Sequence, residues 1–142
     1  MKKIAPPHNI TSKNYNRFKR EYNDELFAIE TNKRSYKRLE YENEDKTIKV
    51  IRPLKPQDIK DEAVQQANCV ASYIDKVMEG RTRILFIRRT NEIDKSYITM
   101  EVNQNGEMIQ AYGACNRKPD AEGLAFIREY CKEKGLKQKQ WR

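Results

Sequence analysis

The most regular pattern of apolar and polar positions predicts a helix in the middle of the chain. Pro56 suits the first turn of a helix, and apolar residues recur after it at three- and four-residue spacing as far as residue 78. The polar stretch at 65–68 is expected to divide this helix into a short piece and a longer one. Gly80 is a suitable end, because glycine tolerates the left-handed conformation that often follows a helix.

Three strands are predicted directly after this helix. Residues 83–88 form a short apolar run bounded by arginines, as in a buried strand. Residues 96–102 and 107–112 are rich in β-branched, aromatic and other apolar residues. The Asn105-Gly106 pair between them favours a tight hairpin turn, so we expect a three-stranded antiparallel meander.

The flanking segments predict further elements. Apolar residues at 25–31 suggest a first strand, and the alternating patterns at 36–41 and 46–51 suggest two more. A last helix is expected to begin near Pro119 and to end at Gly135.

These elements together predict an α+β fold. We expect a mainly antiparallel sheet, made of N-terminal strands plus the meander, with the central and C-terminal helices packed on it. We expect one domain at 25–135, preceded by a basic, aromatic-containing arm at 1–24 and followed by a basic, mobile tail at 136–142.

Charge adds a functional expectation. The chain of 142 residues has a net charge of +8, and such a surface attracts polyanions, nucleic acid above all. In the arm, Arg17 and Arg20 lie among aromatic residues, which could combine phosphate attraction with base stacking. The same aromatic residues could instead dock the arm on the domain or bind a protein partner, and many small basic proteins are merely soluble.

Several function classes lack their usual signatures. The one histidine, His8, and three widely spaced cysteines do not suit a zinc site, and we expect buried, reduced thiols. There is no phosphate-binding loop and no recognisable catalytic motif, so we expect no catalytic residue, metal or cofactor. With no signal peptide and no membrane-spanning apolar run, a cytoplasmic protein is expected.

The order and spacing of residues from the central helix to the end of the meander resemble the PcfJ-like family of conjugative plasmids and phages. The resemblance begins near residue 36 and ends near residue 130. Its motifs are Cys-Val-x-x-Tyr from Cys69, Ile-Leu-Phe-Ile-Arg from Ile84, Tyr-x-Thr-x-Glu-Val from Tyr97, and Ile-Gln-x-x-Gly followed by Asn-Arg. The family usually has histidine immediately before this cysteine, whereas this chain has Asn68.

Polar residues within the matching motifs are the candidate site. A core does not by itself require such residues, so they form either a ligand pocket or a structural polar network. In a pocket, the two arginines would hold a phosphate, a nucleotide or a flipped base, and the amides would read it. The candidates are Tyr73, Arg88, Thr99, Glu101, Gln110, Asn116 and Arg117, with Arg17 and Arg20 of the arm as further nucleic-acid contacts.

We therefore expect a small, non-enzymatic, basic protein of a mobile genetic element that binds nucleic acid or a nucleic-acid complex. One alternative is an inhibitor of a host defence nuclease, similar to anti-CRISPR proteins, that binds an RNA-guided nuclease or its guide RNA. Another is a metal-dependent enzyme acting on nucleic acid, with Glu101 as a base or metal ligand. No membrane partner is expected, and the pattern does not specify the oligomeric state.

Overall fold

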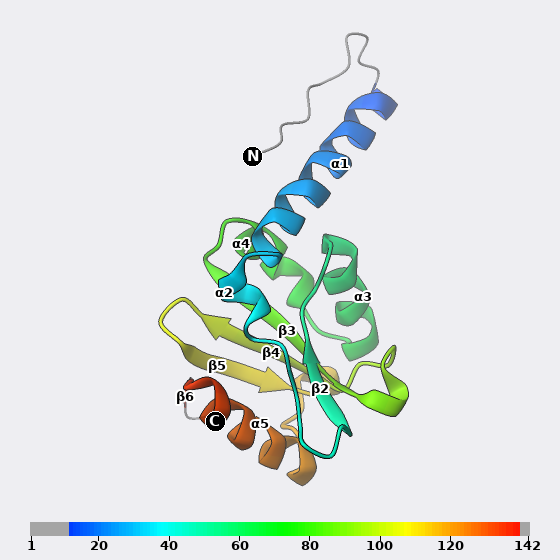
Figure 1. Ribbon diagram of the computed structural model, residues 1–142. Coiled ribbons are helices and arrows are strands. Elements are labelled where there is room, and N and C mark those ends of the chain that lie inside the picture. The colour runs from blue at the N-terminus through cyan, green and yellow to red at the C-terminus, as the bar shows by residue number, and fades with distance from the viewer. Residues whose placement is uncertain (1–11, 140–142) are drawn as a thin grey trace.

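A computed structural model describes residues 12–139 and confirms the α+β class (Figure 1). Its six-stranded sheet has the order β1-β2-β3-β4-β5-β6, in which each strand lies beside its neighbour in sequence. All pairs are antiparallel except β5 and β6, which are parallel. The strands are β1 Tyr41–Glu42, β2 Ile48–Ile51, β3 Thr82–Arg89, β4 Ile98–Asn103, β5 Glu107–Tyr112 and β6 Lys137–Gln138.

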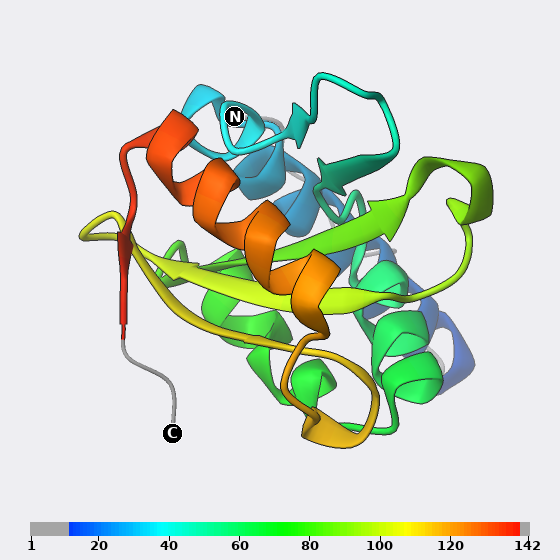
Figure 2. The same cartoon turned by 90° about the horizontal axis from the view of Figure 1, so that it is seen from below.

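Helices cover both faces of this sheet (Figure 2). α1 (Ser12–Thr31), α3 (Pro56–Gln66) and α4 (Ile74–Met78) lie on one side, and α5 (Ala121–Lys134) lies across the other. Burial on both sides explains why β3 is apolar without alternation, since its residues 84–87 are all buried. Within residues 12–139, no helix has both the length and the apolar character needed to cross a membrane.

The predicted break in the central helix is confirmed, but the expected order of lengths is wrong, since α3 has 11 residues and α4 has 5. α3 ends at Gln66, and Ala67 adopts the left-handed conformation, with φ 50° and ψ 53°. A 3-10 helix, η1 (Val70–Tyr73), leads from there into α4. The chain changes direction at this turn, and Tyr73 at the end of η1 lies beside residues of β3, β4 and β5.

The prediction of a strand at 25–31 is wrong, because these residues form the second half of α1. Phe27 and Thr31, four residues apart, are the buried positions, which is the spacing of one helical face. α1 is continuous through the boundary that was predicted between residues 24 and 25. The part of the arm at residues 1–11 lies outside the described residues.

The prediction of a strand at 36–41 is also wrong for most of its length. Arg34–Lys37 form the short helix α2, and β1 begins only at Tyr41. Tyr36 and Leu39 are both buried, and their three-residue spacing follows a helical turn. The Tyr36 hydroxyl donates to the Ile84 carbonyl at 2.6 Å and accepts from the Ile84 amide at 2.8 Å.

The predicted last helix is confirmed as α5, with Asp120 as its N-cap and Gly135 as its left-handed C-cap. Asp120 Oδ1 accepts from the Gly123 amide at 2.8 Å and from the Tyr97 hydroxyl at 2.6 Å. The tail was expected to be mobile, but Lys137–Gln138 form β6 alongside β5. The tail residues 140–142 lie outside the described residues.

Candidate functional site

A cavity of about 480 Å³ lies on the sheet face that η1 covers. Five of the nine predicted site residues line it: Tyr73, Thr99, Glu101, Gln110 and Asn116. The other lining residues are Asn68, Cys69, Val70, Ile84, Met100 and Tyr112. The chain segments that meet here are the turn after α3, η1, the three strands of the meander and η3 (Ala114–Asn116). The sequence therefore identified most of the polar lining of this cavity.

Glu101 is the centre of the cavity's polar contacts. Glu101 is 8% exposed, and its two carboxylate oxygens accept hydrogen bonds from neutral donors. Thr82 Oγ1 donates to Oε2 at 2.6 Å, and Gln110 Nε2 donates to Oε1 at 2.8 Å. Gln110 Nε2 also lies 3.3 Å from the Tyr73 hydroxyl, which ties η1 to the sheet.

Strand register explains why these side chains meet. Glu101 pairs with Ile84 of β3 on one side and with Gln110 of β5 on the other. Directly paired residues of neighbouring strands point to the same face, so the carboxylate and the amide are adjacent. The pairing shifts by one residue between Glu101 and Val102, an irregularity at the edge of the cavity.

Asn68 lies where the resemblance led us to expect histidine. Its Oδ1 accepts from the Val70 amide at 3.0 Å, which fixes the entry into η1, and the residue lines the cavity. Cys69 beside it is exposed, as is Cys115, so the expectation of burial holds only for Cys131. Burial raises the pKa of the Cys131 thiol to about 11, whereas Cys69 is open to solvent.

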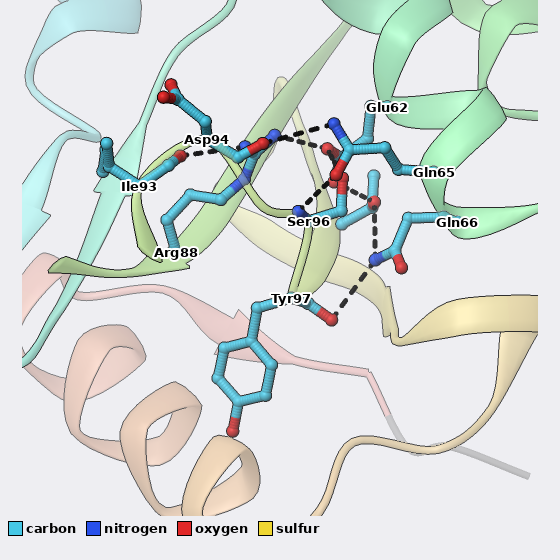
Figure 3. Close-up of polar contacts among 9 residues, drawn as sticks. Glu62, Gln65, Gln66, Arg88, Ile93, Asp94, Ser96 and Tyr97 are labelled. Carbon is cyan, nitrogen blue, oxygen red and sulfur yellow. Dashed lines mark hydrogen bonds and ion pairs between the residues drawn. The ribbon is translucent and has the colours of Figure 1, made fainter. Parts of the chain in front are cut away.

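A second polar network lies on the same sheet face, under α3, and it contains Arg88 (Figure 3). The Arg88 guanidinium pairs with the carboxylate of Glu62, whose side chain has 0% exposure. Ser96 Oγ and Thr99 Oγ1 each donate to that carboxylate at 2.6 Å. Arg88 Nη1 donates to the Ile93 carbonyl at 3.1 Å, so the arginine also holds the β3–β4 connection.

Two glutamines complete this network and attach α3 to the start of β4 (Figure 3). The Ser96 amide donates to Gln65 Oε1 at 2.7 Å. Gln66 Nε2 donates to the Tyr97 carbonyl at 3.2 Å and approaches Thr99 Oγ1 at 3.4 Å. Thr99 therefore belongs to both networks, since it also lines the Glu101 cavity.

The structure does not bring the predicted arginines to the cavity. Arg88 is paired with Glu62. Arg117 is exposed in the turn after η3, where its backbone forms hydrogen bonds with Gly113 and Ala114. A phosphate held in the cavity between these arginines is therefore not supported. Arg17 and Arg20 are exposed on α1, away from the cavity lining.

Sequence reasoning missed Glu62, Gln66 and Thr82. A signal was present for two of them, because Ile59, Glu62 and Gln66 follow the three- and four-residue spacing of one helical face. Thr82 occupies the same face as Ile84 by alternation along β3. The pattern used to predict burial considered apolar residues only, so it did not predict that these polar residues are buried.

The polar residues do not assemble a metal centre of the kind the enzyme alternative requires. Across residues 12–139, no group of three or more histidine, cysteine, aspartate or glutamate side chains is placed to hold a metal ion. The lining of the cavity contains one carboxylate, two tyrosines and three side-chain amides, so it offers both hydrogen-bond donors and acceptors.

Comparison with models of protein families identifies the family of this chain. The family model described as PcfJ-like protein matches residues 2–127, which is most of the chain. Searches of curated proteins and of solved structures find no significant match. The match includes the central helix, the meander and the residues that line the cavity, so the expectation drawn from the sequence motifs is confirmed. The chain belongs to the PcfJ-like family.

Proposed function

We propose that this protein binds nucleic acid through the first half of α1 and serves a mobile genetic element in that role. The observation that carries the proposal is the separation of charge along this helix. Its four basic residues all precede residue 21, and all four are exposed: Lys13, Arg17, Lys19 and Arg20. Its four acidic residues all follow: Glu21, Asp24, Glu25 and Glu30.

This order of charges is the reverse of the order that stabilises a helix. A helix dipole favours acidic residues in the first turn and basic residues in the last turn, and α1 has neither. The arrangement therefore lowers the stability of the helix. This cost argues that the basic side chains serve to bind an anionic partner. Phosphates near the basic half would be attracted both by the side chains and by the positive end of the dipole.

The basic half of α1 is also accessible. It projects from the body of the protein, whereas the acidic half joins the domain (Figure 1). Tyr15 and Tyr22 are 48% and 39% exposed, and Phe18 stacks on Tyr22 with ring centroids 6.0 Å apart. Exposed aromatic rings among basic residues can stack on unpaired bases, so a single strand is the favoured ligand.

A groove continues this surface toward the sheet. It has a volume of about 480 Å³ and lies between α1 and the η1–α4 segment. Three basic residues and two acidic ones line it, and Ala71 and Ser72 form part of the η1 wall. The charged residues are Lys19, Arg20, Asp24, Lys60 and Asp75. A backbone bound along α1 could follow this groove to the body of the protein.

The test is fluorescence anisotropy of a labelled single-stranded oligonucleotide across a salt series. We expect tight, salt-dependent binding by the wild-type protein and weaker binding by Arg17→Ala/Arg20→Ala. If each arginine contacts one phosphate, the slope of log K against log salt becomes shallower by about 1.4, at roughly 0.7 for each contact.

The matched control is Arg128→Ala/Lys132→Ala, which removes the same charge from exposed positions of α5. This variant should keep the wild-type salt slope. Equal losses in both variants would mean that net charge alone governs binding, and no binding at low salt by the wild type would contradict the proposal. A protein target such as a defence nuclease would then be the next candidate.

A further inference from the structure

We propose that the Glu101 cavity holds an unpaired guanine base. The inference rests on the proposed function, because it identifies which part of a bound strand enters the protein. It concerns a surface separate from α1, so it can fail while nucleic-acid binding holds.

The charge of the cavity is the first reason. Glu101 is the one charged residue in the lining, and it is 8% exposed. Among the ion pairs of residues 12–139 none includes Glu101, whereas the other deeply buried glutamate, Glu62, is paired with Arg88. A carboxylate without a cation disfavours phosphate and favours a ligand that donates hydrogen bonds.

The unused acceptors of Glu101 are the second reason. A carboxylate offers about four lone-pair positions, and Thr82 and Gln110 use one on each oxygen. One position on each oxygen remains, which is a pair of adjacent acceptors. The Watson–Crick edge of guanine has two adjacent donors, the N1–H and the exocyclic amine, and these complement such a pair.

The other bases fit less well. Adenine and cytosine each place a ring acceptor beside their amine, and uracil and thymine have a single donor between two carbonyls. Each of these edges would set an acceptor against the carboxylate. Guanine is therefore the base that satisfies both oxygens.

The rest of the lining suits a base that enters the cavity while the sugar-phosphate backbone stays outside it. The cavity volume of about 480 Å³ lies within the range of small-molecule sites. Tyr73 and Tyr112 supply aromatic surface, and the amides of Asn68 and Asn116 supply further polar contacts. η1 forms a wall of both the cavity, through Val70 and Tyr73, and the α1 groove, through Ala71 and Ser72. A strand in the groove therefore lies next to the cavity.

The test is titration of the full chain with each of the four free nucleosides, followed by two-dimensional amide NMR. Free nucleosides have no phosphate, so the measurement does not depend on α1. We expect guanosine to shift resonances of Tyr73, Glu101 and Gln110, and to bind roughly 5- to 150-fold more tightly than the others, the range for a bidentate base contact.

The variant is Glu101→Gln, which replaces one acceptor oxygen by the amide NH2 group, a donor of similar size. This change should abolish the preference for guanosine. The matched control is Glu133→Gln, an exposed position on α5 that loses the same charge. Equal binding of all four nucleosides, or no nucleoside binding, would each overturn the inference.

A second measurement needs no substitution. Cys69 lines the cavity and is exposed, Cys115 is exposed but does not line it, and Cys131 is buried. Guanosine should slow alkylation of Cys69 and leave that of Cys115 unchanged, as read by peptide mass spectrometry. Unchanged alkylation of Cys69 at saturating guanosine would refute the site. If an oligonucleotide still binds with a salt slope, the proposed function stands and only the guanine site fails.

Discussion

At the scale of single residues, two buried carboxylates on one sheet face have different surroundings. Glu62 is paired with Arg88 and has two hydroxyl donors, so its charge is balanced within the fold. Glu101 has neutral donors alone and opens to a cavity. The first arrangement is complete within the fold, whereas the guanine site that we propose would use the acceptor positions that remain on Glu101.

This difference predicts the effect of Arg88→Ala. The substitution leaves the Glu62 carboxylate buried without its cation, which we expect to destabilise the protein by about 3–5 kcal/mol. Urea denaturation followed by circular dichroism measures the loss. Glu62→Leu/Arg88→Met removes both charges and should recover much of it. An unchanged midpoint for Arg88→Ala, with weaker nucleic-acid binding, would return Arg88 to the ligand contacts.

At the scale of elements, α5 is held on the sheet through its N-cap. Hydrogen bonds from the Tyr97 hydroxyl and then from the Gly123 amide lower the pKa of Asp120, and Arg89 adds to the effect. A Cβ at Gly123 would lie 2.6 Å from Ile98 Cδ1, so the first turn of α5 packs closely on β4. The cap and the glycine together fix where the helix begins.

The cap predicts a pH dependence with a defined sign. Because the folded-state pKa of Asp120 is lowered, its ionised form stabilises the fold above the unfolded pKa of about 3.9, and this stabilisation is lost as the pH falls toward the folded value. Asp120→Ala should cost about 1 kcal/mol at neutral pH.

Asp120→Asn is the informative control for this prediction. It keeps an acceptor for the Gly123 amide but has no charge, so it should lose less stability than Asp120→Ala and should remove the Asp120 contribution to acid sensitivity. Thermal melts of the three proteins between pH 2 and pH 7 provide the comparison. Identical pH profiles for wild type and Asp120→Asn would contradict the assignment.

At the scale of the whole molecule, α1 divides into a half that holds the fold and a half that faces outward. The buried residues of α1 are Phe27 and Thr31, both in the second half. Deletion of residues 1–24 should therefore leave a folded protein that has lost most of its nucleic-acid affinity. Amide NMR and anisotropy report the two properties separately, and an insoluble or molten product would show that the first half supports the core.

The sequence predicted the parts of the fold that depend on local patterns. A short apolar run identified β3, and β-branched and aromatic residues on either side of the Asn105-Gly106 turn identified β4 and β5. The polar stretch at 65–68 identified the break after Gln66, and a glycine identified the end of α5 at Gly135. The sequence-based prediction failed at 25–31, where a short apolar run is compatible with the periodicity of a strand or of a helix. Packing of this segment against α4 favours the helix.

The sequence predicted which residues of the candidate site matter, but not which of them contact one another. Tyr73, Glu101 and Gln110 were identified and do meet, since strand register brings the last two together. Arg88 lies on the same face of the sheet, but its partner is Glu62 on α3. Which of two neighbouring networks an arginine joins depends on how α3 lies across the sheet, and no local pattern contains that information.

The two edges of the sheet also limit how this protein can meet a partner. Each edge strand, β1 and β6, has two residues, and β6 pairs only with Glu107 and Met108 of β5. A lysine lies at the start of β6 and another directly after it. Short, charged edge strands offer few free backbone groups, so they resist pairing with strands of other chains. At β1 and β6, pairing with a partner's strand and edge-to-edge aggregation are therefore disfavoured. The contacts that we propose for nucleic acid use side chains of α1 and of the Glu101 cavity instead, which can be altered one at a time without dismantling the sheet.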